Sequence, residues 1–272
     1  PVVGNVELSW TIRNALFLKQ KLGLSCRVAP GASKPILKPY SDNAAIVHGA
    51  EGIDGFKVPQ IREAADPKPA WDVIYEEALG AKGRLRIVTI GPLTNLAIAA
   101  EKYPDLPSLV DGFYMMGGGT FGNKGAAEFN IWIDPDAADR VFKAFEVRMV
   151  GLDACYKAAL SESDLDELIG LSDKDEFLRT LFCHLKSAWL ERGFATNVPY
   201  DPMVVACACD PSLAAWKKCS VRVDTDLKSS ENGRTIISEC EQGERPTYVA
   251  DSVDSKRFYA FLKNMVLHFN KA

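Results

Sequence analysis

Polar residues with types and spacing that suit ligand chemistry occur at a few points in the sequence. Asp201 and Pro202 stand before an apolar stretch, where an aspartate is either a helix cap or an oxygen ligand for a hard cation. Glu128 and Asn130 share one face if their segment is extended, because side chains alternate along a strand. A carboxylate beside a carboxamide suits vicinal hydroxyls. The alternative for this second pair is a solvated loop that precedes a helix cap.

A glycine run and a lone histidine are weaker candidates. Residues 117–122, Gly-Gly-Gly-Thr-Phe-Gly, match the dinucleotide-binding pattern G-x-G-x-x-G in form. That pattern requires a helix to open at once, whereas Asn123-Lys124-Gly125 follow and the next helix is expected at Asp134. The run therefore favours a flexible loop that brings polar groups to a ligand. A lone histidine such as His48 is more often structural or solvent-facing than functional.

Strands that alternate with helices are expected to position these residues. Apolar periodicity and Gly or Pro punctuation predict an α/β fold, with an open, mostly parallel central sheet flanked by helices and antiparallel strands late in the chain. Ligands bind such sheets beyond the carboxyl ends of the strands. The expected strands are 85–90, 109–116, 147–152 and several within 219–250; the expected helices are 71–79, one after 91–95, one from 134, two pieces within 164–192, one from 201, and 253–269. No linker or repeat is visible, so residues 1–272 are read as one domain.

The first quarter of the chain is expected to be less regular. Asn5 is predicted to cap a helix with an apolar stripe of Trp10, Ala15, Leu18 and Leu22, and Gly23 to end it. Leu24–Ala29 is read as a short strand. Residues 30–68 are rich in Pro, Gly, Ser and Asp and read as a long irregular excursion, which in a compact domain usually serves a function.

Composition excludes several classes of protein. The net charge of −4 argues against a nucleic-acid-binding surface, which would show a basic patch. No apolar run reaches the roughly 18 residues that suggest a membrane span. The seven cysteines are scattered and odd in number, which favours reduced thiols in a cytoplasmic protein over a disulfide framework. Three histidines are too few for a His-rich metal site.

Six short motifs, in register along the chain, resemble the inosine–uridine-type nucleoside hydrolase family. Each motif alone is weakly specific, but the six together span nearly the whole sequence. They are Val3-Gly4-Asn5 with Thr11-Ile12-Arg13-Asn14-Ala15, His48-Gly49, Gly91-Pro92-Leu93-Thr94-Asn95-Leu96-Ala97, Met116-Gly117-Gly118-Gly119, Ala127-Glu128-Phe129-Asn130 through Asp134-Pro135, and Asp201-Pro202.

The resemblance implies a role for each matching position. The family binds one Ca²⁺ at the bottom of its pocket, and the positions that match its ligands here are the Ile90 main-chain oxygen and Asp201. Residues that match the family's substrate contacts are Asn5, His48, Met116, Asn123, Glu128 and Asn130. Trp189, Tyr200 and Phe194 are candidates for stacking on a base. The implied reaction is hydrolysis of the N-glycosidic bond of a ribonucleoside by a calcium-bound water, through an oxocarbenium-like sugar.

The resemblance further implies a place in purine and pyrimidine salvage. The partners it implies are a small-molecule ribonucleoside and further copies of the chain, as a homodimer or homotetramer.

The sequence departs from the family pattern in two places. The family's Asp-rich motif, D-x-D-x-G-x-D-D, has no match here, so its strand, its loop and the catalytic aspartate base are expected upstream of Pro1. Several members also have a histidine directly before the metal-binding aspartate, as proton donor to the leaving base, where this chain has Tyr200. Tyr200 is thus expected to contact the leaving group without being a strong acid.

Two other functions remain open from the sequence. One is a catalytically inactive homologue that binds nucleosides or ribose. The other is a nicotinamide-dependent oxidoreductase that uses the glycine run.

Overall fold

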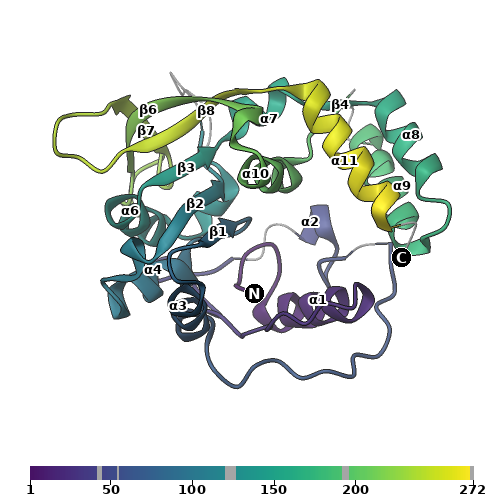
Figure 1. Cartoon of the computed structure of the whole chain (residues 1–272), viewed down its shortest axis with the longest axis horizontal. Coiled ribbons are helices and arrows are strands. Elements are labelled where there is room, and N and C mark those ends of the chain that lie inside the picture. The colour runs from purple at the N-terminus through teal and green to yellow at the C-terminus, as the bar shows by residue number, and fades with distance from the viewer. Residues whose placement is uncertain (42–44, 54, 120–126, 192–195, 270–272) are drawn as a thin grey trace.

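The fold is that of a computed structural model that describes residues 1–41, 45–53, 55–119, 127–191 and 196–269 (Figure 1). The strands in these ranges are β1 (Leu85–Thr89), β2 (Val110–Met116), β3 (Val147–Val150), β4 (Leu160–Ser161), β5 (Thr196–Asn197), β6 (Ala214–Val223), β7 (Thr235–Glu239) and β8 (Thr247–Val253). The α-helices are α1 (Leu8–Lys21), α2 (Ala45–His48), α3 (Ala70–Ala81), α4 (Thr94–Lys102), α5 (Phe129–Ile133), α6 (Pro135–Ala144), α7 (Leu152–Lys157), α8 (Glu162–Leu171), α9 (Glu176–Glu191), α10 (Tyr200–Cys209) and α11 (Ser255–Phe269).

The central sheet is mainly parallel on one side and antiparallel on the other. Its strand order is β1-β2-β3-β8-β6-β7. The β1–β2, β2–β3 and β3–β8 pairs are parallel, whereas β6 runs antiparallel to both β8 and β7. A separate antiparallel pair joins β4 and β5. The α/β fold with late antiparallel strands, predicted from the sequence, is confirmed.

Alternation along β2 divides the core between the two faces of the sheet. Phe113 and Met115 pack with α4 and α6 on one face, while Tyr114 and Met116 pack with α7, α10 and α11 on the other. Burial of both faces is what a parallel sheet requires, and it explains the nearly continuous apolar run of this strand. Figure 1 shows α4 and α6 on the opposite side of the sheet from α10.

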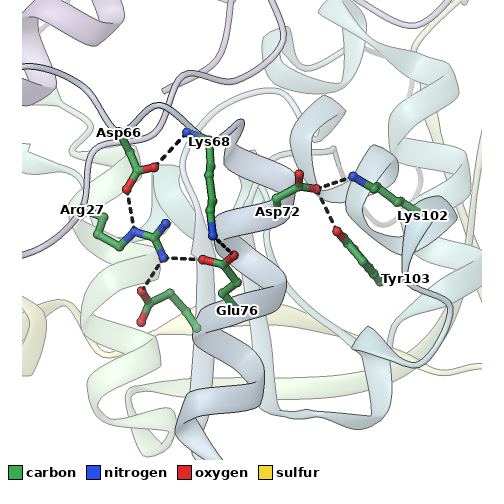
Figure 2. A network of polar contacts seen from close by, with 8 residues as sticks. Arg27, Asp66, Lys68, Asp72, Glu76, Lys102 and Tyr103 are labelled. Carbon is green, nitrogen blue, oxygen red and sulfur yellow. Dashed lines mark hydrogen bonds and ion pairs between the residues drawn. The ribbon is translucent and has the colours of Figure 1, made fainter.

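The segment 24–29 forms no strand, so the short strand predicted there is wrong. Arg27 anchors the segment through ion pairs with Asp66 (2.7 Å), Glu76 (2.8 Å) and Glu77 (3.4 Å) (Figure 2). Side-chain ion pairs therefore hold this segment against α3 where a β ladder was expected. The irregular excursion that follows has the predicted character, with only α2 as regular structure among its described residues.

Two helix-boundary signals read from the sequence are present in the structure, whereas α1 differs from its prediction in two respects. Asp134 caps α6 by accepting a hydrogen bond from the Ala137 N–H (3.1 Å), and Gly23 follows α1 with a φ of +61°, both as predicted. Asn5, however, does not cap α1, which begins at Leu8 after an uncapped Glu7. The α1 stripe also differs from prediction: its buried residues are Asn14, Leu16 and Phe17.

The helices and the cysteines can be compared with what the sequence predicts for membrane spans and disulfides. None of the helices in the described ranges combines the length and apolar character that crossing a bilayer demands. All seven cysteines are free, with Cys155, Cys207 and Cys219 buried. The prediction of reduced thiols agrees with this pattern.

Candidate active site

A cavity of about 380 Å³ opens at the carboxyl ends of β1, β2 and β3. Ile90 follows β1, Met116 ends β2, and Leu152 lies two residues beyond β3. This is the edge at which open parallel sheets bind ligands. The residues that line it are Asn5, Val47, His48, Ile90, Met116, Ala127, Glu128, Phe129, Asn130, Leu152, Tyr200 and Asp201.

The Glu128 carboxylate joins the end of β2 to the start of α5. Its Oε1 accepts from the Asn130 N–H (3.0 Å), and its Oε2 accepts from the N–H groups of Gly118 (3.1 Å) and Ile131 (3.2 Å). Burial raises the pKa of Glu128 to about 7, although these three bonds favour the charged form. The buried carboxylate therefore caps α5 and also holds the loop after β2, through Gly118, against the start of that helix.

The segment that carries Glu128 and Asn130 is not extended, so the predicted reason for their shared face is wrong. Glu128 is the N-cap of α5 and Asn130 lies in its first turn. Both residues nevertheless line the cavity. Asn130 donates through Nδ2 to the Met116 main-chain oxygen (3.3 Å) and approaches Met116 Sδ (3.5 Å). Its Oδ1 accepts no hydrogen bond from the described residues.

Asp201 lies within the first turn of α10 and is not its cap, because the N-cap position belongs to Pro199. Desolvation raises the pKa of the Asp201 carboxyl to about 6. Within the described part of the chain, this carboxylate has no hydrogen-bond or ion-pair partner. Asp201 is only partly buried, but a desolvated carboxylate without a partner is costly, which is why such groups often mark a functional site.

Tyr200 lines the cavity next to Asp201 in the chain. Burial, and then hydrogen bonding with the Tyr156 side chain, raise the pKa of its phenol well above the usual range. The Tyr200 hydroxyl thus stays protonated and is available as a neutral hydrogen-bond donor. Its ring meets that of Tyr156 edge to face, with centroids 6.2 Å apart and planes at 80°.

In the described part of the glycine run, Gly118 and Gly119 do not present their N–H groups to a ligand. Gly118 donates to Glu128, and the Gly119 N–H donates to Thr235 Oγ1 (2.9 Å). Past the run, α5 is the next helix in the described part of the chain, and it begins at Phe129. A dinucleotide site would need free amides at a helix that opens at once, so this arrangement argues against one.

Eight of the residues singled out in the sequence line this one cavity. They are Asn5, His48, Ile90, Met116, Glu128, Asn130, Tyr200 and Asp201. Asn123 and Phe194 lie outside the described residues. Trp189 belongs to α9, but its side chain is also outside what the structure describes.

Four lining residues were missed: Val47, Ala127, Phe129 and Leu152. Leu152 had a usable signal, since it is the last residue of the strand predicted over 147–152. Val47 lies in the irregular excursion, where apolar residues give no periodic signal.

Comparison with known proteins agrees with this geometry. Residues 1–260 match the model of the inosine-uridine preferring nucleoside hydrolase family. The chain belongs to that family. The non-specific ribonucleoside hydrolase RihC of Salmonella paratyphi B is 35% identical over 241 residues, which cover 87% of this chain and 76% of that protein.

Solved structures show the same relationship. A purine-preferring ribonucleoside hydrolase from Gardnerella vaginalis superposes with a TM-score of 0.90 at 27% identity, covering 99% of this chain and 89% of that one. A plant nucleoside hydrolase gives a TM-score of 0.85, also at 27% identity, covering 97% and 88% of the two chains. The family and the fold predicted from the sequence are confirmed, and by resemblance the chain is a nucleoside hydrolase.

Proposed function

We propose that the cavity binds a ribonucleoside and that the chain hydrolyses its N-glycosidic bond to a free base and ribose. The observation that carries this proposal is the convergence of Asn130, Glu128 and Asp201 on one cavity at the strand ends. Its volume of about 380 Å³ lies within the range of small-molecule sites. The mix of apolar walls with a few polar groups also suits a ligand that is part sugar and part aromatic base.

The sugar is proposed to lie against Asn130, Asn5 and Met116. Asn130 has its Nδ2 engaged with Met116, so its Oδ1 is directed to accept from a ribose hydroxyl. Asn5 adds a second carboxamide to the lining, and Met116 contributes an apolar contact to the ring. Hydrogen bonds to hydroxyls hold the sugar for attack and stabilise the transition state when they strengthen as charge develops.

Asp201 and the main-chain oxygen of Ile90 would hold the Ca²⁺ ion that the family resemblance implies. The fit rests on an observation: Asp201 is a desolvated carboxylate with no partner in the described residues, and carboxylate and carbonyl oxygens are the ligands that Ca²⁺ prefers. When bound, Ca²⁺ supplies acidification and orientation of the attacking water. The described residues contain no group of three or more His, Cys, Asp or Glu side chains that would complete the shell.

The leaving base is proposed to meet Tyr200 and His48. Tyr200 is a neutral donor, so it can hydrogen-bond a base heteroatom as negative charge develops there. His48 lines the same cavity from α2. The exclusion of water by Phe129, Leu152 and Val47 would strengthen both interactions.

A second function, binding of a nucleoside or ribose without hydrolysis, is favoured by one observation. Hydrolysis needs a base that accepts the proton of water. Among the described residues, Glu128 and Asp201 are the only carboxylates that line the cavity. Both carboxylate oxygens of Glu128 already accept hydrogen bonds from backbone N–H groups. A homodimer or homotetramer and a part in purine and pyrimidine salvage are proposed on the family resemblance alone, and a cytoplasmic location on the scattered cysteines.

One experiment separates hydrolysis from binding. The full chain is incubated with a panel of purine and pyrimidine ribonucleosides, and reducing sugar is measured with added Ca²⁺ and with chelator. Hydrolysis predicts sugar release that depends on Ca²⁺. Equal rates after chelation would contradict the metal role, and saturable binding of inosine by calorimetry without any sugar release would leave the binding function in its place.

A further inference from the structure

The motif Thr11-Ile12-Arg13-Asn14-Ala15 lies on α1 and has no role in the function proposed so far, since none of its residues lines the cavity. Asn14 differs from the other polar residues of the motif because only 9% of it is exposed. A buried carboxamide is costly unless its polar atoms have partners. The partners of Asn14 therefore indicate what the motif does.

Asn14 joins α1 to the turn that follows α2. Its Nδ2 donates to the Glu51 main-chain oxygen (2.7 Å). Its Oδ1 accepts from Arg13, through Nε (3.2 Å) and Nη2 (3.1 Å). Arg13 Nη1 in turn forms an ion pair with the Glu51 carboxylate (2.6 Å). Two adjacent residues of α1 thus hold both the backbone and the side chain of Glu51.

The turn 49–52 also fits closely against α1. The Gly52 N–H donates to the Gly49 main-chain oxygen (3.2 Å), which closes the turn directly after His48. Gly52 has a φ of +79°, and a Cβ there would lie 2.9 Å from Val6 Cγ2 and 3.1 Å from Asn14 Nδ2. Glycine permits both this conformation and this close approach.

The turn leads directly to His48, the last residue of α2, which lines the cavity. A helix of four residues is too short to be stable on its own, so contacts outside α2 must hold it. Figure 1 shows α2 next to α1. We propose that Asn14 is a positioning residue, which fixes the turn 49–52 and thereby keeps His48 at the base end of the cavity. This inference rests on the proposed function, in which His48 meets the leaving base.

An isosteric substitution tests the role of Asn14. Asn14→Asp keeps the size of the side chain and the acceptor for Arg13, but it replaces the donor to Glu51 with an oxygen that repels the carbonyl. His48 should then lose its position, and kcat/KM for inosine should fall about fivefold, the effect of one ordinary hydrogen bond. Free ribose has no base, so its inhibition constant should stay unchanged.

A double-mutant cycle with His48→Ala shows whether Asn14 acts through His48. Effects of residues that act through one another are not additive, whereas those of independent residues are. In the His48→Ala background, Asn14→Asp should therefore change kcat/KM for inosine by less than about twofold. A general weakening of the fold would instead lower activity by the same factor in both backgrounds.

Gln20, on the same helix, provides a matched control. Its Oε1 accepts from the Arg62 N–H (3.1 Å), so it also holds the backbone of the irregular excursion, but ten residues beyond Gly52. Gln20 does not line the cavity, and Gln20→Ala should leave kcat/KM and ribose inhibition unchanged. Thermal melts show whether each variant is folded. If Asn14→Asp is not, Gly52→Ala displaces the same turn by steric contact and should give the same pattern.

Each outcome decides the matter. A loss that is confined to inosine and disappears in the His48→Ala background supports the role of Asn14. A loss that persists without His48, or that extends to ribose, shows that Asn14 only supports the fold, and no loss at all shows that the turn needs no clamp; all three overturn this inference alone. If the unaltered chain releases no sugar from inosine, the proposed hydrolysis itself fails, and the positioning role fails with it.

Discussion

The two carboxylates of the cavity, the buried Glu128 at the start of α5 and the partly buried Asp201 at the start of α10, have opposite surroundings. Glu128 accepts three backbone N–H groups, whereas Asp201 has no hydrogen-bond or ion-pair partner in the described residues. Both have raised pKa values, about 7 for Glu128 and about 6 for Asp201, and desolvation is the main cause in each. A raised pKa alone therefore does not assign a role; the bonds around the carboxylate do.

This comparison divides the cavity into a fixed part and a reactive part. The α5 region is held by its own hydrogen bonds and positions the groups that face the sugar. The α10 region keeps an electrostatically unfavourable group in place, which is reasonable only if a ligand or cation compensates for it. Substitutions in the two regions should consequently affect activity and stability in different proportions.

Asp201→Asn should have the largest effect on activity. Loss of the charged ligand is expected to lower kcat/KM for nucleosides at least about 100-fold and to weaken binding of Ca²⁺, which calorimetry measures directly. At the same time the variant should unfold at a higher temperature when no cation is added, because a desolvated charge costing about 2 kcal/mol is removed.

The matched control for Asp201→Asn is Asp210→Asn, at the other end of the same helix. Asp210 is paired with Arg257 (2.6 Å) and does not line the cavity. It should leave Ca²⁺ binding unchanged. Equal Ca²⁺ affinity of the Asp201 variant and the unaltered chain would remove Asp201 from the metal site.

Asn130→Ala should come next in size. The loss of a preorganised polar contact to the sugar is expected to cost about 2–4 kcal/mol of transition-state binding, measured as the change in kcat/KM. Asn232→Ala deletes a carboxamide that lies outside the cavity, and it should leave kcat/KM unchanged. An unaltered kcat/KM in the Asn130 variant would exclude this residue from the site.

Glu128→Gln should act mainly on stability. An amide keeps only one of the two acceptor oxygens and directs N–H groups at a backbone donor, so the free energy of unfolding should fall by about 1–3 kcal/mol. Asp134→Asn is the matched control: Asp134 is fully buried and accepts from Thr94 Oγ1 (2.6 Å) and the Ile36 N–H (3.0 Å), but it does not line the cavity. Both variants should lose stability in denaturant titrations, but only Glu128→Gln should also raise KM.

The same contrast explains what the sequence could and could not predict. The strands at 85–89 and 110–116 have strong apolar patterns bounded by Gly and Pro, and their positions were predicted closely. The helix α5 was missed because its five residues, Phe129–Ile133, have a strand-like apolar composition. Their helical start is capped by the Glu128 side chain, which accepts from the Asn130 and Ile131 N–H groups and also from the Gly118 N–H ten residues earlier.

The remaining errors have the same origin. Leu24–Ala29 resembles a strand but pairs with none of the strands that the structure describes, and ion pairs of Arg27 hold it in place. The helix α7 was not predicted: Leu152 was read as the end of a strand, and Gly151, which precedes the helix, provides no side-chain cap to signal its start. The site residues were found through family motifs rather than through such patterns, and for that reason their roles stay predictions even though eight of them line one cavity.

The smallest expected effect is the pH dependence of stability in the α10 region. The folded-state pKa of Asp201, about 6, lies above its ordinary value of 3.8, so the unfolded chain releases this proton first as pH rises. Below about pH 4 the carboxyl is protonated in both states and costs nothing; between about pH 4 and 6 stability falls, and above that the penalty is constant. The stability gain of Asp201→Asn over the unaltered chain should therefore grow by about 1 kcal/mol between about pH 5 and 7. Denaturant titrations in the presence of chelator measure this difference in the free energy of unfolding between the two proteins. Both proteins contain Glu128, so the contribution of its titration largely cancels from the difference. A gain that stays constant with pH would mean that Asp201 is not desolvated, and the distinction between the two carboxylates would then rest on hydrogen bonding alone.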